Sequence, residues 1–502
     1  MNIPGISLIK QTEHHSEKRA IIDSAGQFSY AQLLDASARF ASFLLSREKD
    51  LKESRVAFLI APGFQYVAAQ WGIWRAGGIA VPLSVLHPRP ELEYVVQDSD
   101  ASILVAHPDF AERLRPIAKE LGRRFILTTE ALNAESLPLP EIEPDRRAMI
   151  LYTSGTTGKP KGVVTTHKNI EVQIASLISA WGWTAQDHIL HVLPLHHTHG
   201  IINVLCCAIW AGATCEFLPG FDAEAVWARF KKGGLTLFMA VPTIYTKLIS
   251  FWEAAPPSDQ KIMSEACSKM RLMVSGSAAL PVSVLETWKS ISSHVLLERY
   301  GMTETNMILS NPLQGKRVPG FVGTPLPGIE VKRLDEKKNP VKPEVQGEIL
   351  VRGPGVFKEY WRKPAETKKD FYEGWFCTGD IAVMENGVYR LLGRSSVDII
   401  KTGGYKVSAL EIEEVLRIHP DIDDCAVVGI EDPEWGELVS AALILKEKSR
   451  LTLDSLRDWA KQQLAVYKIP RQILLTPAFP RNAMGKVSKP EIKRLFKGKS
   501  TE

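Results

Sequence analysis

The segment 151–162, LYTSGTTGKPKG, carries a dense set of groups that could bind phosphate. It combines three glycines, four aliphatic hydroxyls and two lysines directly after an apolar run. Glycines let a backbone approach a ligand closely, while N–H, hydroxyl and ammonium groups neutralise phosphate oxygens. A solvated turn is the ordinary interpretation of a Gly/Ser/Thr segment, but this density favours a polyphosphate-binding loop. Its binding residues would be Thr153, Ser154, Gly155, Thr156, Thr157, Gly158, Lys159 and Lys161.

This loop differs from a P-loop, which requires a hydroxyl residue directly after its lysine. Six further motifs follow it along the chain. They are 193–200 (LPLHHTHG), 275–278 (SGSA), 299–304 (RYGMTE), 377–380 (CTGD) with 392–394 (LGR), 401–406 (KTGGYK) and 480–486 (PRNAMGK). In this order, over the whole chain, the motifs resemble the signatures of the adenylate-forming superfamily, which includes acyl-CoA synthetases, luciferases and peptide-synthetase adenylation domains. The resemblance implies that ATP and Mg²⁺ activate a carboxylic acid, which then passes to coenzyme A.

The resemblance also implies a nucleotide site. Its tyrosine would lie on adenine, Thr303 on the α-phosphate, and Glu304, together with Thr156, on Mg²⁺. Attack of a carboxylate on phosphorus concentrates negative charge, which a metal ion and hydroxyl donors can neutralise. The other expected nucleotide contacts come from Ser275, Gly276, Ser277, Glu298, Arg299, Tyr300, Gly301, Met302, Thr303, Asp380 and Arg394. A structural Asp380–Arg394 salt bridge is the alternative for the last two.

Two lysine-bearing loops near the C-terminus are implied to serve the two half-reactions. Lys486 would complete the adenylation site by bridging the carboxylate and the α-phosphate. The thioester step would use Lys401, Gly403, Gly404 and Lys406. Two such loops in one small domain predict two orientations of that domain. The linking segment 395–398 is one residue longer than in many relatives and has Ser396 where they carry Asp or Lys, so no single pivot residue is assigned.

The motifs around the acyl pocket resemble those of malonyl-CoA synthetases, which act on malonate or methylmalonate. His197 matches the gate of that pocket and is expected to take part in catalysis. A buried second carboxylate needs a charged partner, and Arg299 is the expected one because a guanidinium pairs a carboxylate at two points. Lys247, where bacterial relatives carry a second arginine, and His199 are the other candidates. A structural pair between Arg299 and Glu298 is the alternative.

Three other functions fit parts of the pattern. A ligase of the same fold for a medium-chain or aromatic monocarboxylate would have an apolar pocket. An amino-acid adenylation domain would carry an acidic residue for the substrate amine. A non-catalytic nucleotide-binding protein would be expected to have lost Glu304, Asp380, Arg394 or Lys486, and all four are present.

The elements that must position these residues alternate between helical and strand patterns, which favours an α/β fold with parallel strands. Apolar runs predict strands near residues 56–60, 79–81, 103–105, 237–241 and 272–274, and helices near 33–44 and 66–74. Shorter segments at 340–394 predict a small β-rich subdomain. We therefore expect a large N-terminal domain with packed sheets over 1–394 and a small, mobile α+β domain over 395–502.

Composition narrows the class of protein. The 502 residues carry a net charge of only +4, so neither nucleic acid nor a membrane surface is an expected partner. No apolar run approaches the roughly 20 residues of a membrane span. The six cysteines form no Cys-x-x-Cys pair, which indicates reduced thiols. The N-terminus lacks a signal-peptide or transit-peptide pattern, so we expect a cytoplasmic protein, or one in the mitochondrial matrix if a transit peptide was removed. No pattern indicates an oligomeric state.

Overall fold

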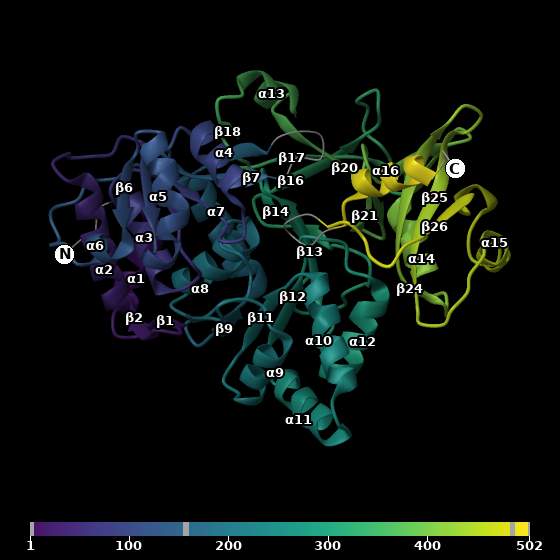
Figure 1. Cartoon of the computed structure of the whole chain (residues 1–502), viewed down its shortest axis with the longest axis horizontal. Helices are drawn as coiled ribbons and strands as arrows, with labels where there is room; N and C mark the ends of the chain where they lie inside the picture. Colours follow the sequence, from purple (N-terminus) through teal and green to yellow (C-terminus); the bar gives the residue numbers. More distant parts are fainter. Residues whose placement is uncertain (1–4, 154–159, 482–486, 500–502) are drawn as a thin grey trace.

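The computed structural model describes residues 5–153, 160–481 and 487–499 and has an α/β fold (Figure 1). Its strands form four sheets, of nine, seven, five and five strands. The two larger sheets and their helices occupy the N-terminal part. The five-stranded sheet formed by the C-terminal residues lies at the opposite end, with the C-terminus (Figure 1). The fold class predicted from the sequence is confirmed.

The nine-stranded sheet runs in the order β15-β14-β13-β12-β11-β9-β10-β1-β2. From β1 to β13 neighbouring strands are parallel, and the outer strands at both edges are antiparallel. Its strands are β1 (Arg19–Asp23), β2 (Gly26–Ser29), β9 (His188–His191), β10 (Thr214–Phe217), β11 (Leu237–Ala240), β12 (Leu272–Ser275), β13 (Leu297–Met302), β14 (Asn306–Ser310) and β15 (Thr324–Pro325).

The seven-stranded sheet runs in the order β18-β8-β7-β4-β3-β5-β6. Its strands are β3 (Arg55–Leu59), β4 (Ile79–Pro82), β5 (Ile103–Ala106), β6 (Arg124–Leu127), β7 (Arg147–Thr153), β8 (Lys161–Thr166) and β18 (Glu359–Tyr360). Strands β3, β4 and β5 are almost entirely buried, which is why each reads as a continuous apolar run in the sequence. The strand predictions at 56–60, 79–81, 103–105, 237–241 and 272–274 are confirmed.

One large apolar core joins the two sheets through the helices packed against them. The expected helices are present as α2 (Tyr30–Leu45) and α3 (Phe64–Arg75). A side chain at Gly72 would come within 2.7 Å of Phe40, so a glycine is needed where the two helices meet. The other helices of the N-terminal part are α1 (Ser7–Thr12), α4 (Arg89–Ser99), α5 (Ala111–Glu120), α6 (Thr128–Leu132), α7 (His167–Trp181), α8 (Cys207–Trp210), α9 (Ala223–Lys231), α10 (Pro242–Ala254), α11 (Pro257–Ser268), α12 (Val282–Ser292) and α13 (Pro364–Lys369).

The expected β-rich subdomain is a five-stranded antiparallel sheet. It consists of β16 (Glu330–Leu334), β17 (Gly347–Arg352), β19 (Phe371–Tyr372), β20 (Trp375–Glu385) and β21 (Val388–Arg394). The sheet packs its own apolar cluster against β14.

The C-terminal sheet has separate apolar clusters of its own, with α14, α15 and α16 around it. Its elements are β22 (Ile399–Thr402), β23 (Tyr405–Ser408), α14 (Ala409–Leu416), β24 (Ile422–Asp432), β25 (Gly436–Leu445), α15 (Leu453–Ala460), β26 (Gln472–Leu475) and α16 (Lys489–Lys499). The predicted boundary after residue 394 falls between the last residue of β21 and the first residue of β22. We keep this division into two domains as a proposal.

An ion pair between a buried aspartate and a more exposed arginine fixes the amino ends of the central parallel strands. Both oxygens of Asp187 accept from Arg271, at 2.7 and 2.6 Å, and further bonds come from Thr184 and Thr236. Burial raises the pKa of Asp187, but these hydrogen bonds outweigh burial and hold its pKa below the usual value. The pair therefore joins the segment before β9 to β12.

We predict that Arg271→Leu destabilises the protein by about 3 kcal/mol, because it leaves the Asp187 carboxylate buried and unpaired. The matched control is Arg352→Leu, whose partner Glu330 is 57% exposed. Such a surface pair contributes about 0–1 kcal/mol. Urea denaturation followed by fluorescence measures both variants, and equal losses would contradict the structural role given to Asp187.

Candidate nucleotide and carboxylate site

The candidate residues gather where the parallel strands of the large sheet end. Strands β11, β12 and β13 run side by side, with Ala240 opposite Ser275 and Ser275 opposite Glu298. Ligands of parallel α/β sheets bind outside the carboxyl ends of the strands. The motifs at 275–277 and 298–304 therefore share one edge of the sheet, as their sequence positions after apolar runs predict.

The Arg299 guanidinium is buried at this edge without an acidic partner. The side chain is 4% exposed, and its Nε has no hydrogen-bond partner within the described residues. Within the described residues its one side-chain hydrogen bond is a long one of 3.5 Å, from Nη2 to the Ser277 hydroxyl. Burial lowers the pKa of Arg299 to about 9. A buried cation in this condition is an incomplete site that an anion would complete.

Glu298 does not supply that anion. Successive side chains of β13 point to opposite faces, and the Glu298 carboxylate accepts instead from the N–H of Gly320 at 3.1 Å. Burial raises the pKa of Glu298 to about 8, and the nearby Glu414 adds to the rise. The alternative Glu298–Arg299 pair is therefore absent from the structure.

The turn after β12 is shaped around this guanidinium. A Cβ at Gly276 would lie 2.4 Å from Cζ of Arg299, so any larger residue there would have to displace the guanidinium. Ser277 has a left-handed φ of 68°, and its hydroxyl lies 3.2 Å from Nδ1 of His199. Ser275 is fully buried, and within the described residues its hydroxyl has no partner. His199 and Arg299 thus meet at Ser277.

The predicted adenine and ribose residues are in direct contact. The Tyr300 hydroxyl donates to Asp380 Oδ2 at 2.5 Å, and Arg394 Nε donates to Oδ1 at 3.1 Å. The Asp380–Arg394 salt bridge was the structural alternative for these residues, and it is present. Both carboxylate oxygens therefore already have protein donors, so a ribose would share or replace them.

Glu304 lies in the turn between β13 and β14 and is 6% exposed. Its Oε1 accepts from the Tyr360 hydroxyl at 3.0 Å. Burial raises its pKa, while Tyr360, Arg394 and Lys161 act in the opposite direction. No described cationic side chain forms an ion pair with it. A buried carboxylate in this state fits Mg²⁺, which commonly takes one or two carboxylates and otherwise binds substrate phosphates. No group of three or more His, Cys, Asp or Glu residues that could hold a metal ion occurs in the described ranges.

Lys161 links the predicted phosphate loop to Glu304. Its ammonium lies 4.2 Å above the Tyr360 ring and 3.2 Å from Glu366. The loop therefore begins and ends on the same side of the molecule as Glu304, although Lys161 itself is paired with α13. Thr153 ends β7. The other loop residues, Ser154, Gly155, Thr156, Thr157, Gly158 and Lys159, lie outside the described residues, as does Lys486.

The remaining candidates for the acyl pocket, His197 and Lys247, are less closely associated with Arg299. His197 is half-buried, with its ring 4.1 Å from that of His196. Burial lowers the pKa of His196 to about 4, so this ring is neutral at physiological pH. Lys247 is exposed on α10, and its ammonium lies 5.8 Å from the Phe221 ring. Within the described residues Lys247 forms no hydrogen bond with Arg299, so the role of Lys247 stays a prediction.

The thioester-loop candidates form the hairpin β22–β23. Gly403 and Gly404 have φ values of 53° and 82° at its turn. Lys401 and Lys406 are exposed, and both ammonium groups lie near Glu336 of the β-rich subdomain, at 3.6 and 2.8 Å. The hairpin therefore contacts that subdomain through both lysines.

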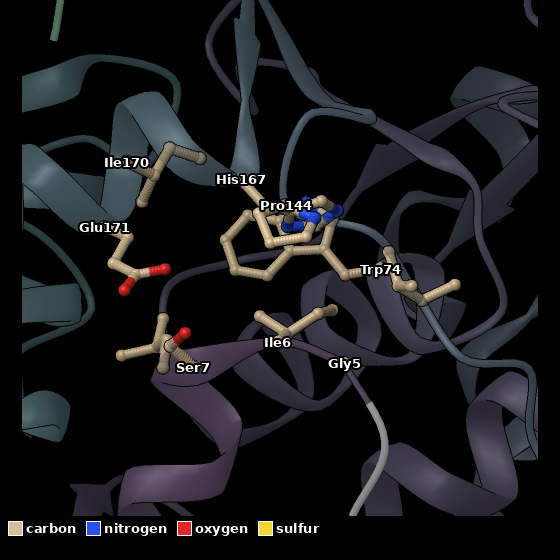
Figure 2. Close-up of a pocket in the computed structure, with 10 residues that line it drawn as sticks. Gly5, Ile6, Ser7, Trp74, Pro144, His167, Ile170 and Glu171 are labelled. Carbon is tan, nitrogen blue, oxygen red and sulfur yellow. The ribbon is translucent and has the colours of Figure 1, made fainter. Parts of the chain in front are cut away.

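A small pocket in another part of the structure is lined by none of the candidate site residues. Figure 2 shows it near the N-terminus, lined among others by Trp74, Pro144 and His167. His167 is buried there, which lowers its pKa to about 3. No helix in the described part of the chain is long and apolar enough to cross a membrane.

Sequence reasoning missed Tyr360, the hydrogen-bond donor to Glu304. Only the fold reveals it, because β18 pairs with β8 in a different sheet from β13. It also missed Asp398 and Lys489, which form an ion pair of 2.6 Å across 91 residues. An aspartate directly before an apolar strand was the one visible signal for Asp398.

Comparison with known proteins gives consistent matches. The family described as AMP-binding enzyme matches residues 8–361, and the AMP-binding enzyme C-terminal domain matches residues 411–486. The mitochondrial malonate–CoA ligase ACSF3 of Mus musculus is 47% identical over 96% of this chain and 89% of its own length. The ATP-bound crystal structure of MatB from Rhodopseudomonas palustris has a TM-score of 0.91 at 33% identity and covers 99% of both chains. A malonyl-CoA ligase ternary product complex with methylmalonyl-CoA and AMP has a TM-score of 0.69 at 33% identity, covering 93% of this chain and 97% of the other.

The raised pKa of Glu298 yields a prediction about stability. In the folded state this carboxyl stays protonated up to about pH 8, whereas in the unfolded chain it ionises near 4.5. Stability should therefore fall as pH rises from 5 to 8, by on the order of 4 kcal/mol from this group alone. Glu298→Gln should remove this part of the pH dependence, and thermal melting at pH 5, 6.5 and 8 measures it. The exposed Glu286→Gln is the control, and unchanged pH dependence in Glu298→Gln would refute the assignment.

Proposed function

The chain belongs to the family of AMP-binding enzymes and is an AMP-forming acid–CoA ligase, and we propose that its acid is malonate or methylmalonate. It would convert this dicarboxylate, ATP and coenzyme A to the acyl-CoA thioester, AMP and pyrophosphate. The relatives named above act on malonate or carry methylmalonyl-CoA. Their names suggest the substrate, and the Arg299 site gives the suggestion a physical basis.

The unpaired Arg299 guanidinium is the observation that carries the proposal. A malonate molecule has one carboxylate to activate and a second that must be buried with it. Arg299 would pair the second, with the Ser277 hydroxyl and His199 at 3.2 Å from each other beside it. A monocarboxylate would leave the guanidinium as it is, buried without an anion, which disfavours the alternative ligase for fatty or aromatic acids.

In the first half-reaction, one carboxylate oxygen of the acid attacks the α-phosphorus of ATP and the bond to the β-phosphate breaks. Tyr300, Asp380 and Arg394 would hold the nucleoside in place, and Thr303 would donate to the α-phosphate. Glu304 would hold Mg²⁺ on the phosphates, and that ion would neutralise their charge. Lys486 would bridge the reacting oxygens from the C-terminal domain.

In the second half-reaction, the thiol of coenzyme A attacks the acyl carbon and AMP leaves. We propose that the hairpin with Lys401, Gly403, Gly404 and Lys406 enters the site for this step. The similarity scores of the two solved structures named above support two domain orientations. At the same 33% identity, the ATP-bound one has a TM-score of 0.91 and the CoA product complex one of 0.69. The arrangement seen here then corresponds to the ATP-bound orientation.

We propose a reducing compartment, the cytoplasm or the mitochondrial matrix, for the reaction. All six cysteines are free thiols, and five of them are buried. The mouse relative is named as mitochondrial. Cell fractionation of the tagged protein distinguishes the two compartments.

We predict that Arg299→Ala lowers kcat/KM for malonate more than a hundredfold. Breaking a buried carboxylate–guanidinium pair costs about 3–5 kcal/mol. Gly276→Ala should act in the same direction, because its new methyl group displaces that guanidinium. Gly220→Ala, which meets nothing within 4 Å, is the matched control. Lys247→Ala should have a smaller effect, since an ammonium lacks the two-point geometry.

The measurement is pyrophosphate release with malonate, methylmalonate and butyrate. Butyrate activity should fall much less than malonate activity in Arg299→Ala, or rise. An equal decrease for all three acids would refute the dicarboxylate assignment and favour a general acyl-CoA ligase. The wider acid panel, with amino acids included, also detects an adenylation domain or an inactive nucleotide-binding protein.

We predict that Lys486→Ala impairs adenylate formation and spares thioester formation from a presynthesised malonyl-adenylate. Electrostatic contacts made only in the transition state are often worth about 3 kcal/mol, or roughly a hundredfold in rate. Single-turnover assays of each half-reaction separate the two steps. If both steps slow equally, Lys486 is not specific to adenylation.

A further inference from the structure

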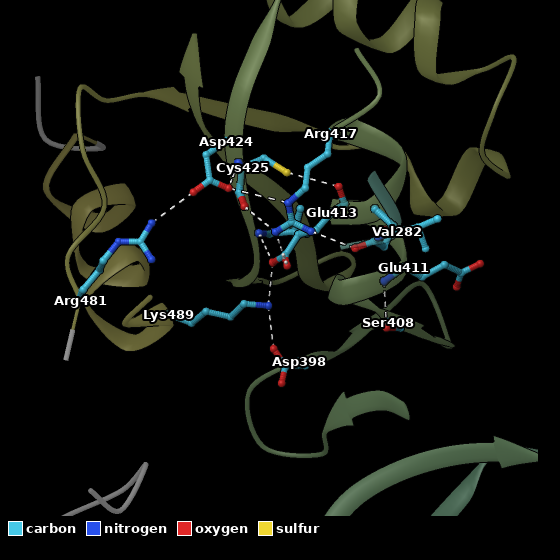
Figure 3. Close-up of polar contacts among 12 residues, drawn as sticks. Val282, Asp398, Ser408, Glu411, Glu413, Arg417, Asp424, Cys425, Arg481 and Lys489 are labelled. Atoms are coloured by element: carbon cyan, nitrogen blue, oxygen red, sulfur yellow. Dashed lines mark hydrogen bonds and ion pairs between the residues drawn. The ribbon is translucent and has the colours of Figure 1, made fainter. Parts of the chain in front are cut away.

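Lys489, the first residue of α16, is a buried lysine that none of the proposed reaction steps uses. Its side chain is 9% exposed, and its ammonium pairs with two carboxylates at once. Asp398 Oδ1 lies at 2.6 Å and Glu413 Oε1 at 2.8 Å. Burial lowers the pKa of Lys489, but the two carboxylates more than offset burial and raise it above the usual value. Figure 3 shows the ammonium directly between them.

Asp398 connects this ammonium to the proposed nucleotide site. Its second oxygen, Oδ2, accepts from the backbone N–H of Arg394 at 2.9 Å, and its own N–H donates to the Arg394 carbonyl at 2.8 Å. Arg394 in turn donates to Asp380, which accepts from Tyr300. A continuous series of polar contacts therefore runs from Lys489 to the proposed adenine and ribose residues.

Glu413 connects the same ammonium to the C-terminal sheet. Its Oε1 also accepts from the Val427 N–H of β24 at 2.8 Å, and its Oε2 lies 3.4 Å from Arg417. Arg417 pairs with Glu414, whose Oε2 accepts from the N–H of Val282 at the start of α12. The other labelled contacts in Figure 3 extend this network to Asp424 and Arg481.

Lys489 is the cation on which the charge balance of this network depends most. Asp398 is 17% exposed and Glu413 5% exposed, so neither carboxylate is well solvated. Arg417 lies close to Glu413, but among the described residues its ion pairs are with Glu413, Glu414 and Asp424 and not with Asp398. Without Lys489, Asp398 would be left in a poorly solvated position next to Arg394, where it would compete with Asp380 for that guanidinium.

We propose that Lys489 is a positioning residue for the nucleotide site: by holding Asp398 it fixes the backbone of Arg394 and keeps the Arg394 guanidinium on Asp380. This inference rests on the proposed nucleotide role of Asp380 and Arg394. It makes nucleotide affinity depend on the first residue of the last helix, although Lys489 touches none of Tyr300, Asp380 and Arg394 within the described contacts.

The test measures AMP binding by calorimetry, together with KM for ATP and for malonate, in Lys489→Met. We expect AMP to bind about tenfold more weakly, because small displacements of binding groups have large effects. KM for ATP should rise in parallel, and KM for malonate should stay within about twofold, since Arg299 is not part of the series. A merely structural lysine would instead lower the melting temperature and leave the ratio of the two KM values unchanged.

Three further variants sharpen the test. Lys489→Arg should retain AMP affinity, because a guanidinium can pair both carboxylates. Asp398→Asn added to Lys489→Met should recover most of the affinity, because it removes the uncompensated charge while an amide oxygen still accepts from Arg394. Lys493→Met, one turn along α16, is the matched control. Its partner Glu437 lies at 3.6 Å, and it should behave as wild type.

Unchanged AMP affinity in folded Lys489→Met, or no recovery in the double variant, would overturn the proposal. If Lys489→Met does not fold, Asp398→Ala carries the test, because it removes the same acceptor from Arg394 and should weaken AMP equally. Wild-type protein that binds AMP with this lysine dependence but does not use malonate would refute only the proposed substrate. Wild-type protein that does not bind AMP would refute both.

Discussion

A buried guanidinium without an anion is the constraint on which this account of the site depends. Arg299 lies within β13, directly after the residue at which the pairing of β13 with β12 ends, and the surrounding chain is arranged to leave it there. Gly276 has no side chain, Ser277 takes a left-handed conformation, and Glu298 points to the other face. Leaving a buried charge unpaired is costly, so such a site is more easily understood as part of a binding function than as a contribution to stability.

The nucleotide side of the site is organised differently. There the polar groups already form hydrogen bonds with one another. Tyr300 and Arg394 donate to Asp380, and Tyr360 donates to Glu304. A nucleotide would exchange these contacts for its own. The hydrogen-bonded carboxylates of Asp380 and Glu304 and the unsatisfied guanidinium of Arg299 suit a reaction that transfers the adenylyl group of ATP to a dianionic acid.

Much of this arrangement could be predicted from the sequence. The buried parallel strands are short apolar runs, and the motifs follow these strands, so both the sheet and the edge that carries the candidate site were predictable. The partners of individual side chains were not. Tyr360 reaches Glu304 across 56 residues and Lys489 reaches Asp398 across 91, and neither pair has a local pattern that marks it. Lys161 was expected to face phosphate, but the structure pairs it with Glu366 of a helix that the sequence analysis did not foresee.

We propose that a second negative charge on the acid selects the substrate. The most direct measurement compares wild-type kcat/KM for malonate with that for its monomethyl ester, which retains the reacting carboxylate and the carbon chain but lacks the second charge. Loss of a buried ion pair predicts that the ester is at least about a hundredfold poorer. Equal activity with malonate and the ester would contradict the account, because Arg299 would then have no role in choosing the acid.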